Sequence, residues 1–187
     1  KFNKTKISTK SSKGSQGVEL RRRKQMTIMI KQMETSEEIE GKSLVHWQTW
    51  REAYDDLLPT EFQETMTLER CRFFSQKYPE NTLIAIDGVK VVGFISYGNF
   101  RDETIQAGEI IALYVLKDYY GKGIAQKLIK AALIALDHFS EIFLWVLKDN
   151  KCAIAFYQKM GFTFDGQEKI LELGKPIKEK RMVFYSK

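Results

Sequence analysis

Hydrophobic and polar residues follow different periods along the chain, and each period predicts an element. Residues 26–33 are rich in β-formers with weak alternation, which predicts a first strand. In residues 36–58 apolar positions recur every three or four residues, which predicts an amphipathic helix that ends before Pro59. Thr60 is a candidate N-cap for a second helix over 60–77.

The rest of the chain predicts short strands and two more helices. Apolar runs over 83–86 and 89–97 flank Asp87-Gly88, a tight hairpin signal. The run 142–147 lacks alternation and therefore predicts a strand buried on both faces. The remaining predicted elements are strands over 109–116, 169–173 and 181–185 and helices over 123–139 and 153–160, the last ended by Gly161.

Charge divides the chain into two parts. Residues 1–25 carry nine Lys and Arg against Glu19, a balance of +8 that leaves residues 26–187 at −2. Few large apolar side chains occur in the first part, so we expect a disordered basic tail, either native or an added upstream segment, before one globular domain over 26–187. The mild acidity of that domain argues against nucleic-acid binding, and no apolar run approaches the roughly 20 residues that cross a membrane.

Cysteine usage predicts a reducing environment. Cys71 and Cys152 form no CxxC motif and have no His at metal-ligand spacing. We therefore expect two free thiols, no metal site and a cytoplasmic protein without a secretory signal. Cys152 has no supporting His for a nucleophilic role and is expected to be a small packed thiol, while His46 and His138 are expected near helix surfaces.

The segment most informative about function is the turn between the run 109–116 and the following helix. Its glycines let the backbone approach a ligand, and the helix N-terminus offers unpaired N–H groups and a positive dipole end. Lys122 adds a cation, so the turn predicts a phosphate site. Gln126 stands where a dinucleotide fingerprint needs a third glycine, and no P-loop Gly-Lys-Ser/Thr occurs at this turn. A turn shaped only for packing is the alternative.

Two segments resemble the motifs of one family. Tyr120–Ala125 resembles the pyrophosphate motif Gln/Arg-x-x-Gly-x-Gly/Ala of the GNAT superfamily of acetyl-CoA-dependent N-acetyltransferases, with Tyr120 in place of Gln or Arg. Asn150–Phe162 is similar to the family's Asn-x-x-Ala-x-x-Phe-Tyr-x-x-x-Gly-Phe, with every named position present. The two motifs stand in the expected order, and the resemblance covers nearly all of residues 26–187.

The resemblance implies a fold and a reaction. The fold is α/β (α+β), with a mixed, mostly antiparallel sheet of six to seven strands that splays between the fourth and fifth strands and about four flanking helices. The reaction is direct transfer of an acetyl group from acetyl-CoA to a primary amine in a ternary complex, without a metal. A coenzyme-binding sensor or scaffold without turnover is the alternative. The expected partners are acetyl-CoA, an amine-bearing acceptor and a second copy in a homodimer.

Two residues are candidate catalytic groups. By resemblance, Tyr157 faces the coenzyme sulfur, where a phenol can protonate the leaving thiolate; a ring packed under the sheet is the alternative. Glu109 stands where some relatives carry a carboxylate base, although a solvent-facing Glu at a strand edge fits the pattern equally well. Trp145 occupies the place of another acid in some relatives, which favours Glu109.

The other predicted contacts are to the coenzyme and the acceptor. The resemblance implies that backbone groups of Leu113, Tyr114 and Val115 hold the pantetheine arm, with a bulge N–H near Leu113 as the oxyanion donor, and that Asn150 binds the arm or caps the last helix. The turn is expected to contribute Tyr120, Gly121, Lys122, Gly123, Ile124, Ala125 and Gln126. The acceptor is expected between 47–62 and 174–179, beside Trp47, Trp50, Tyr54 and Phe62 and the acidic Asp55, Asp56, Glu61 and Glu64; core aromatics and a solvated acidic face are the alternative.

Overall fold

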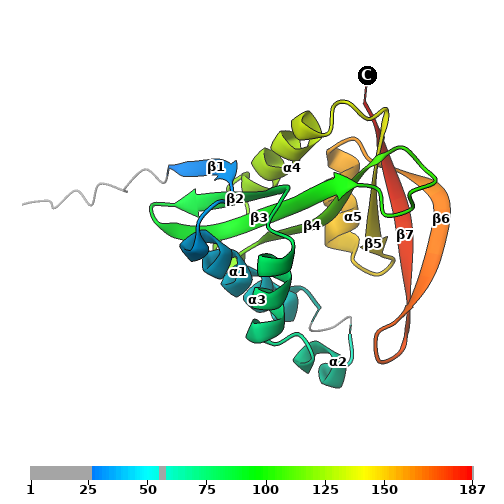
Figure 1. Ribbon diagram of the computed structural model, residues 1–187. Helices are drawn as coiled ribbons and strands as arrows, with labels where there is room; N and C mark the ends of the chain where they lie inside the picture. The colour runs from blue at the N-terminus through cyan, green and yellow to red at the C-terminus, as the bar shows by residue number, and fades with distance from the viewer. Residues whose placement is uncertain (1–26, 55–57, 187) are drawn as a thin grey trace, which may run out of the picture.

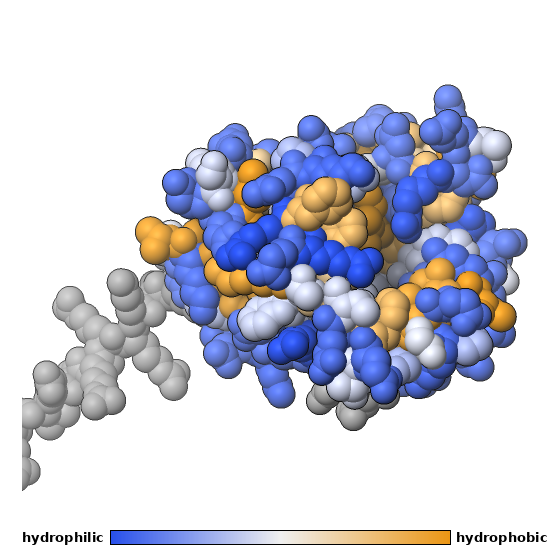
Figure 2. All heavy atoms as spheres, turned by 60° about the horizontal axis from the view of Figure 1, so that its bottom comes forward, coloured by the Kyte–Doolittle hydropathy of each residue, from blue (hydrophilic) through white to orange (hydrophobic). Residues whose placement is uncertain are grey.

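The computed structural model describes residues 27–54 and 58–186, with one sheet through the middle and helices on both of its faces (Figure 1). The predicted tail over 1–25 lies outside the described residues, and so do Asp55 and Asp56. Seen from below in Figure 2, hydrophilic side chains cover most of the surface, and apolar ones gather in separate patches.

The sheet has seven strands in the order β1-β2-β3-β4-β5-β7-β6. Every neighbouring pair is antiparallel except β4 and β5, which run parallel. The predicted mixed, mostly antiparallel sheet is therefore confirmed. The strands are β1 (Ile28–Gln32), β2 (Thr82–Asp87), β3 (Lys90–Asn99), β4 (Gly108–Val115), β5 (Glu141–Leu147), β6 (Thr163–Glu172) and β7 (Pro176–Tyr185).

Helices cover both faces of the sheet. The ring of His46 packs on Phe94 of β3 on one face. An added Cβ at Gly108 of β4 would meet Leu136 on the other face, 3.2 Å away. The described helices are α1 (Ser36–Tyr54), α2 (Thr60–Glu64), α3 (Leu68–Lys77), η1 (Lys117–Tyr119), α4 (Ile124–Ala135) and α5 (Lys151–Lys159). In Figure 1, α1 and α3 lie on the first face and α4 and α5 on the second, as right-handed crossovers from β4 to β5 and from β5 to β6 require.

The prediction of one helix over 60–77 is wrong, because this segment forms α2 and α3. Thr67 caps α3, and its Oγ1 accepts a hydrogen bond from the Arg70 N–H at 3.2 Å. Thr60 is the first residue of α2, and the N-cap is Pro59. The apolar residues keep a helical spacing through the whole segment, but the cap at Thr67 starts a new helix within it.

The hairpins follow the predicted turns, but the last one is longer than predicted. Gly88 joins β2 to β3 with φ +64°, which confirms the Asp-Gly turn. The strands β6 and β7 extend beyond their apolar runs because ion pairs link them across the ladder. Lys169 Nζ lies 3.1 Å from a Glu179 oxygen, and Lys178 Nζ lies 2.6 Å from a Glu168 oxygen.

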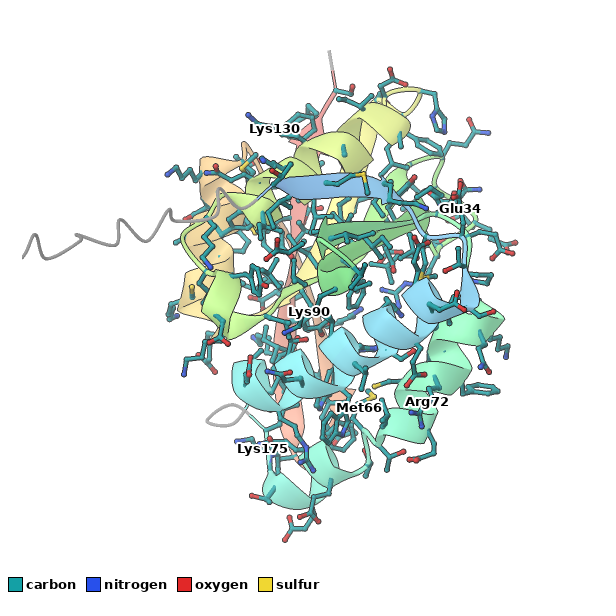
Figure 3. All side chains as sticks on the ribbon, turned by 90° about the vertical axis from the view of Figure 1, so that its left-hand side faces the viewer. Glu34, Met66, Arg72, Lys90, Lys130 and Lys175 are labelled. Atoms are coloured by element: carbon teal, nitrogen blue, oxygen red, sulfur yellow. The ribbon has the colours of Figure 1, made fainter. Side chains whose placement is uncertain are left out.

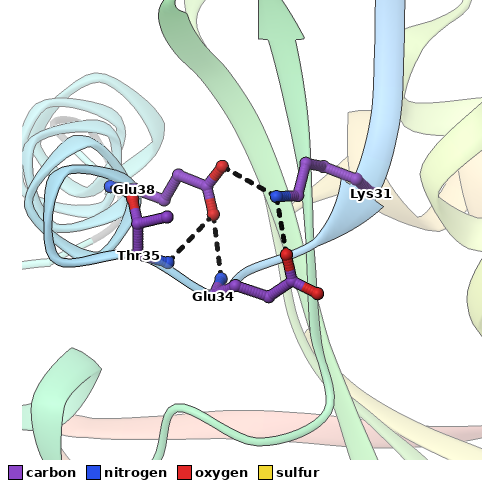
Figure 4. Close-up of polar contacts among 4 residues, drawn as sticks. All are labelled: Lys31, Glu34, Thr35 and Glu38. Carbon is purple, nitrogen blue, oxygen red and sulfur yellow. Dashed lines mark hydrogen bonds and ion pairs between the residues drawn. The ribbon is translucent and has the colours of Figure 1, made fainter.

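The junction of β1 and α1 is fixed by a capping box (Figure 4). Thr35 Oγ1 accepts a hydrogen bond from the Glu38 N–H, and Glu38 Oε2 accepts from the N–H groups of Glu34 and Thr35. Lys31 Nζ lies 2.9 Å from a Glu34 oxygen and 3.0 Å from the other oxygen of Glu38. The helix cap is therefore Thr35, one residue before Ser36.

Polar side chains join α1 to α3 (Figure 3). Arg72 Nε and Nη2 donate to the Glu40 carboxylate at 2.8 and 2.6 Å. Lys42, only 6% exposed, donates to Ser75 Oγ at 3.0 Å, and its Nζ lies 4.7 Å from the centroid of the Phe94 ring. A lysine cation is thus buried in this layer with a hydroxyl and a ring as its described contacts.

Candidate active site

The sheet opens between β4 and β5. These strands pair only over 108–110 and 142–144, and they diverge beyond that point. A register shift between β3 and β4 leaves Ile111 as the extra residue of a β-bulge. The predicted separation of the fourth and fifth strands is therefore present. A bulge was expected near Leu113, and the observed bulge lies two positions before that residue. The edge of β4 beyond the bulge is not paired with β5.

The turn between β4 and α4 holds two glycines in the left-handed region. The φ angle is +73° at Gly121 and +74° at Gly123, which side chains with a Cβ rarely adopt. An added Cβ at Gly121 would meet nothing within 4 Å, and one at Gly123 only the Gln126 side chain at 3.9 Å. Close packing does not explain these glycines, and the space over the turn is open to a ligand.

The first turn of α4 suits an anion. Gly123 is the N-cap and makes no side-chain cap, so the first-turn N–H groups over 124–126 have no capping side chain. Lys122 Nζ lies 4.5 Å from the centroid of the Tyr119 ring, which places a cation beside the turn. Tyr120, at the motif position of Gln or Arg, is 57% exposed. An open glycine turn, a free helix start and a neighbouring cation together fit a diphosphate.

Three phenols gather at the opening of the sheet. Tyr54 Oη of α1 and Tyr114 Oη of β4 lie 3.2 Å apart. Burial, with the nearby Tyr54 phenol as a second cause, raises the pKa of Tyr157 on α5 well above its ordinary value. Burial also raises the pKa of Tyr54 and of Tyr114. All three phenols therefore stay protonated at neutral pH and are available as proton donors.

The start of α5 combines a cap with an exposed thiol. Asn150 Oδ1 accepts a hydrogen bond from the Ala153 N–H at 3.0 Å, so the capping role expected as one of two is present. Two turns later the Tyr157 ring packs edge-on to Phe162, with 5.9 Å between centroids. Cys152 is exposed, so the prediction of a packed thiol is wrong.

Glu109 is fully buried, contrary to the alternative of a solvent-facing Glu. Arg101, in the connection between β3 and β4, donates from Nε and Nη2 to Glu109 Oε1 at 3.1 and 2.6 Å. Its Nε and backbone N–H also lie 2.9 and 3.3 Å from Oε2. Both carboxylate oxygens are thus engaged by one guanidinium. No motif linked Arg101 to this site, because the two residues meet only through the fold.

His46 is partly exposed, but its ring is turned toward the sheet rather than lying free at the helix surface. Its ring lies 5.3 Å from that of Tyr114, centroid to centroid. Burial, and then the nearby charge of Lys42, lower the pKa of His46 to about 3, so the ring is neutral. His46 Nδ1 and Trp50 Nε1 are buried without a hydrogen-bond partner among the described residues. Both atoms lie one or two turns before Tyr54 on α1.

The two predicted walls of the acceptor site touch each other. An added Cβ at Gly174, in the β6–β7 loop, would lie 3.3 Å from Phe62 and from Pro59. The β6–β7 loop therefore packs against the start of α2.

The predicted aromatic lining is divided between two places. Trp50 packs on Tyr54 with 4.6 Å between ring centroids, close to the opening of the sheet. Trp47 instead lines a separate groove of about 380 Å³ with Val89 and Leu116. Trp47 therefore does not join the other aromatic candidates, while Glu61 and Glu64 are exposed on α2.

The described residues form neither a metal-binding cluster nor a membrane-spanning helix. Across 27–54 and 58–186, no three His, Cys, Asp or Glu side chains lie close enough to hold a metal ion together. Among the described helices, none combines the length and the apolar character that crossing a membrane requires.

Comparison with known proteins gives matches across this region. The model of the Acetyltransferase (GNAT) family matches residues 47–162. N-alpha-acetyltransferase 30 of Schizosaccharomyces pombe is 31% identical over 109 residues, which cover 57% of this chain and 73% of the relative. A probable spermine N(1)-acetyltransferase of Bacillus subtilis subsp. natto is 36% identical over 84 residues, which cover 41% of this chain and about half, 55%, of the relative.

A solved structure shares the whole architecture. The PaiA N-acetyltransferase from Thermoplasma acidophilum in complex with coenzyme A superposes with a TM-score of 0.66 at 22% identity. The match covers 86% of this chain and 99% of that one. The two chains therefore share the same overall fold.

Proposed function

This chain belongs to the acetyltransferase (GNAT) family and is an N-acetyltransferase that moves the acetyl group of acetyl-CoA to an amine, and from this premise we propose a role for Tyr157. We propose that the Tyr157 phenol protonates the thiolate that leaves when the amine attacks the thioester. The observation that carries the proposal is the position of this phenol. It lies at the opening between β4 and β5 together with the Tyr54 and Tyr114 phenols, and burial holds its pKa well above the ordinary value. A neutral phenol can donate a proton to sulfur at short range.

The coenzyme is proposed to lie along the opened edge of β4. The turn over 120–126 suits its diphosphate, since the glycine turn and the free start of α4 are open there. The backbone over 113–115 suits its pantetheine arm, because this edge is not paired with β5. The N–H at or just after the bulge at Ile111 is a candidate donor to the oxyanion. When bound, acetyl-CoA supplies the thioester that the amine attacks.

The acceptor is proposed to be an α-amine at a polypeptide N-terminus. An amine must be neutral to attack, and an α-amine has a pKa near 8 whereas an alkyl amine has one near 10.4. Both oxygens of Glu109 accept hydrogen bonds from Arg101, so the best-placed carboxylate already has a partner for each oxygen. A site of this kind suits an amine that is already partly neutral. The N-alpha-acetyltransferase relative supports this acceptor class.

A polyamine is the second candidate acceptor. The observation that favours it is the similarity to a probable spermine acetyltransferase over 84 residues. Thiol release from acetyl-CoA separates the two candidates. The acceptors are a peptide with a free N-terminus, the same peptide with a blocked N-terminus and an internal Lys, and spermine. We expect the free N-terminus to be acetylated fastest between pH 7 and 8; faster turnover of spermine would replace the first candidate with the second.

Tyr157→Phe tests the proton donor. We expect kcat to fall about a hundredfold, because a positioned general acid contributes at least that much, while calorimetry should give a nearly unchanged Kd for coenzyme A. Tyr185→Phe is the control, since Tyr185 is 61% exposed at the end of β7. Equal kcat for Tyr157→Phe and the parent would remove Tyr157 as the donor. Coenzyme binding without transfer to any amine would favour a non-catalytic sensor.

Two further features stay predictions. A cytoplasmic location is consistent with free cysteines at Cys71 and Cys152. A homodimer is expected from the resemblance, and sedimentation of the full chain would test it.

A further inference from the structure

A pocket of about 460 Å³ lies beside the opening of the sheet, formed by β5, β6, β7 and the start of the β3–β4 connection. Three cationic side chains, from Arg101, Lys169 and Arg181, surround the rings of Phe100 and Trp145. Trp145 is the first residue of β5 beyond its pairing with β4. The pocket therefore begins where the two strands separate, next to the place where the amine must arrive.

Arg181 of β7 lines the pocket and is fixed by an ion pair and a ring contact. Arg181 Nε donates to Asp165 Oδ2 at 2.6 Å, and the guanidinium carbon lies 4.3 Å from the centroid of the Phe143 ring. Its side chain is 15% exposed. Because Nε makes the bond to Asp165, the two Nη groups are the part of the guanidinium that remains for another partner.

Lys169 of β6 is likewise fixed by a ring contact and an ion pair. Lys169 Nζ lies 4.1 Å from the centroid of the Trp145 ring and 3.1 Å from a Glu179 oxygen. An ammonium carries more N–H groups than one carboxylate contact uses. Across the pocket, Arg101 binds Glu109 with Nε and Nη2, and 62% of the Arg101 side chain is exposed.

A count of donors and acceptors shows what the pocket lacks. The three carboxylates behind it, from Glu109, Asp165 and Glu179, each already contact a cation. Asp102 is the one carboxylate in the described lining, and its Oδ1 accepts from the Thr104 N–H and hydroxyl at 3.1 and 2.6 Å. These four carboxylates outnumber the three cations by one and fix them in place, but the Arg181 Nη groups and the spare Lys169 N–H groups have no hydrogen-bond acceptor among the described residues. A ligand there must bring oxygen acceptors.

We propose that this pocket binds a carboxylate of the acceptor, a few bonds away from the amine that is acetylated. The inference rests on the proposed function, because the same molecule must place its amine at the opening of the sheet. A carboxylate supplies acceptor atoms for Arg101, Lys169 and Arg181, whereas the ammonium groups of a polyamine carry only donors. The carboxylate comes either from an acidic side chain next to an N-terminal residue or from the α-carboxylate of a free amino acid.

Matched acceptors test the proposal on the full chain. The peptides begin Ser-Glu, Ser-Gln and Ser-Lys and are otherwise identical, and free serine and serinamide form a second pair. We expect kcat/KM for Ser-Glu to exceed that for Ser-Gln by about tenfold, because one partly exposed charge-assisted hydrogen bond is gained. The excess over Ser-Lys should be larger. A preference for serine over serinamide instead would identify the α-carboxylate as the source. Equal kcat/KM within both pairs, or a preference for Ser-Lys, would overturn the proposal.

Variants of Lys169 localise the effect. Lys169→Met should reduce the preference for Ser-Glu over Ser-Gln to about twofold, and Lys169→Glu should reverse it in favour of Ser-Lys. The Ser-Gln rate reports whether the reaction itself is intact. Lys178→Met is the matched control, because Lys178 lies on β7, pairs with Glu168 and does not line the pocket. An unchanged preference in both Lys169 variants would also overturn the assignment.

Binding separates this inference from the proposed function. Calorimetry with the chain saturated in coenzyme A measures peptide Kd without turnover. Tighter binding of Ser-Glu than of Ser-Gln, lost in Lys169→Glu, supports the pocket even if no amine is acetylated. Acetylation of Ser-Gln and Ser-Glu at equal rates with equal Kd supports the transfer reaction and rejects the pocket.

Discussion

At the scale of single residues, Glu109 shows how a partner limits what a carboxylate can do. A buried carboxylate near the reacting groups is a natural candidate for a base. Here both oxygens accept from Arg101, and taking a proton would weaken charge-assisted bonds in a buried place. The geometry favours a role in which Glu109 orients Arg101 toward the acceptor pocket, and in which the proton of the amine leaves to solvent.

Glu109→Gln tests this role. We expect the free energy of unfolding to fall by about 1–3 kcal/mol, because the amide keeps a hydrogen bond to Arg101 but loses the charge. With Ser-Gln as the acceptor, the pH dependence of kcat/KM should keep its acidic limb, which then belongs to the α-amine. Denaturant unfolding and a pH–rate profile measure the two effects. Loss of the acidic limb would make Glu109 the base; Glu103→Gln, at an exposed position in the same connection, is the control.

At the scale of elements, the turn before α4 carries the coenzyme hypothesis. Gly123 is at once the N-cap of α4 and a residue with φ +74°. Asn and Asp both tolerate this backbone region and both cap helices well, and their side chains have nearly the same shape. The pair therefore separates charge from conformation at one position.

We expect Gly123→Asp to bind coenzyme A at least tenfold more weakly than Gly123→Asn, because an added anion opposes the diphosphate. The Asp variant should be at least as stable as the Asn variant without coenzyme, since an acidic cap favours the helix dipole. Calorimetry gives the two Kd values and thermal unfolding gives the stabilities. Equal Kd values for the two variants would mean that the diphosphate does not lie at this turn.

Features formed by residues close together in the sequence could be predicted from it, whereas contacts between residues far apart in the sequence could not. The strand, glycine turn and helix over 109–135 follow from local signals, namely an apolar run, two glycines and a helical period. The Tyr54–Tyr114 contact joins residues 60 positions apart, and no period or motif marks it. The Arg101–Glu109 pair spans a connection whose path only the folded sheet defines. The break at Thr67 was hidden because apolar spacing continued across it.

At the scale of the whole molecule, Lys42 links the packing of α1 on the sheet to stability. Burial lowers the pKa of Lys42 from 10.5 to about 8. Between pH 8 and 10.5 the unfolded chain holds a proton that the folded chain has released, so stability should rise with pH across this window. Below pH 8 both states are charged, and the cost of burying the cation, on the order of 3 kcal/mol, is fully present.

Lys42→Met should therefore stabilise the protein at pH 7, by about 1–3 kcal/mol, because a flexible apolar chain fills the same space without a buried charge. Ser75 keeps a partner in the variant, since its hydroxyl also donates to the Cys71 carbonyl at 2.7 Å. The difference between parent and variant should shrink from pH 8 to 10.5, measured by urea unfolding at each pH. Lys130→Met, at an exposed position of α4, should show no such trend. A constant difference across the window would mean that Lys42 keeps its proton, and that its charge is stabilised by more than Ser75 and the Phe94 ring.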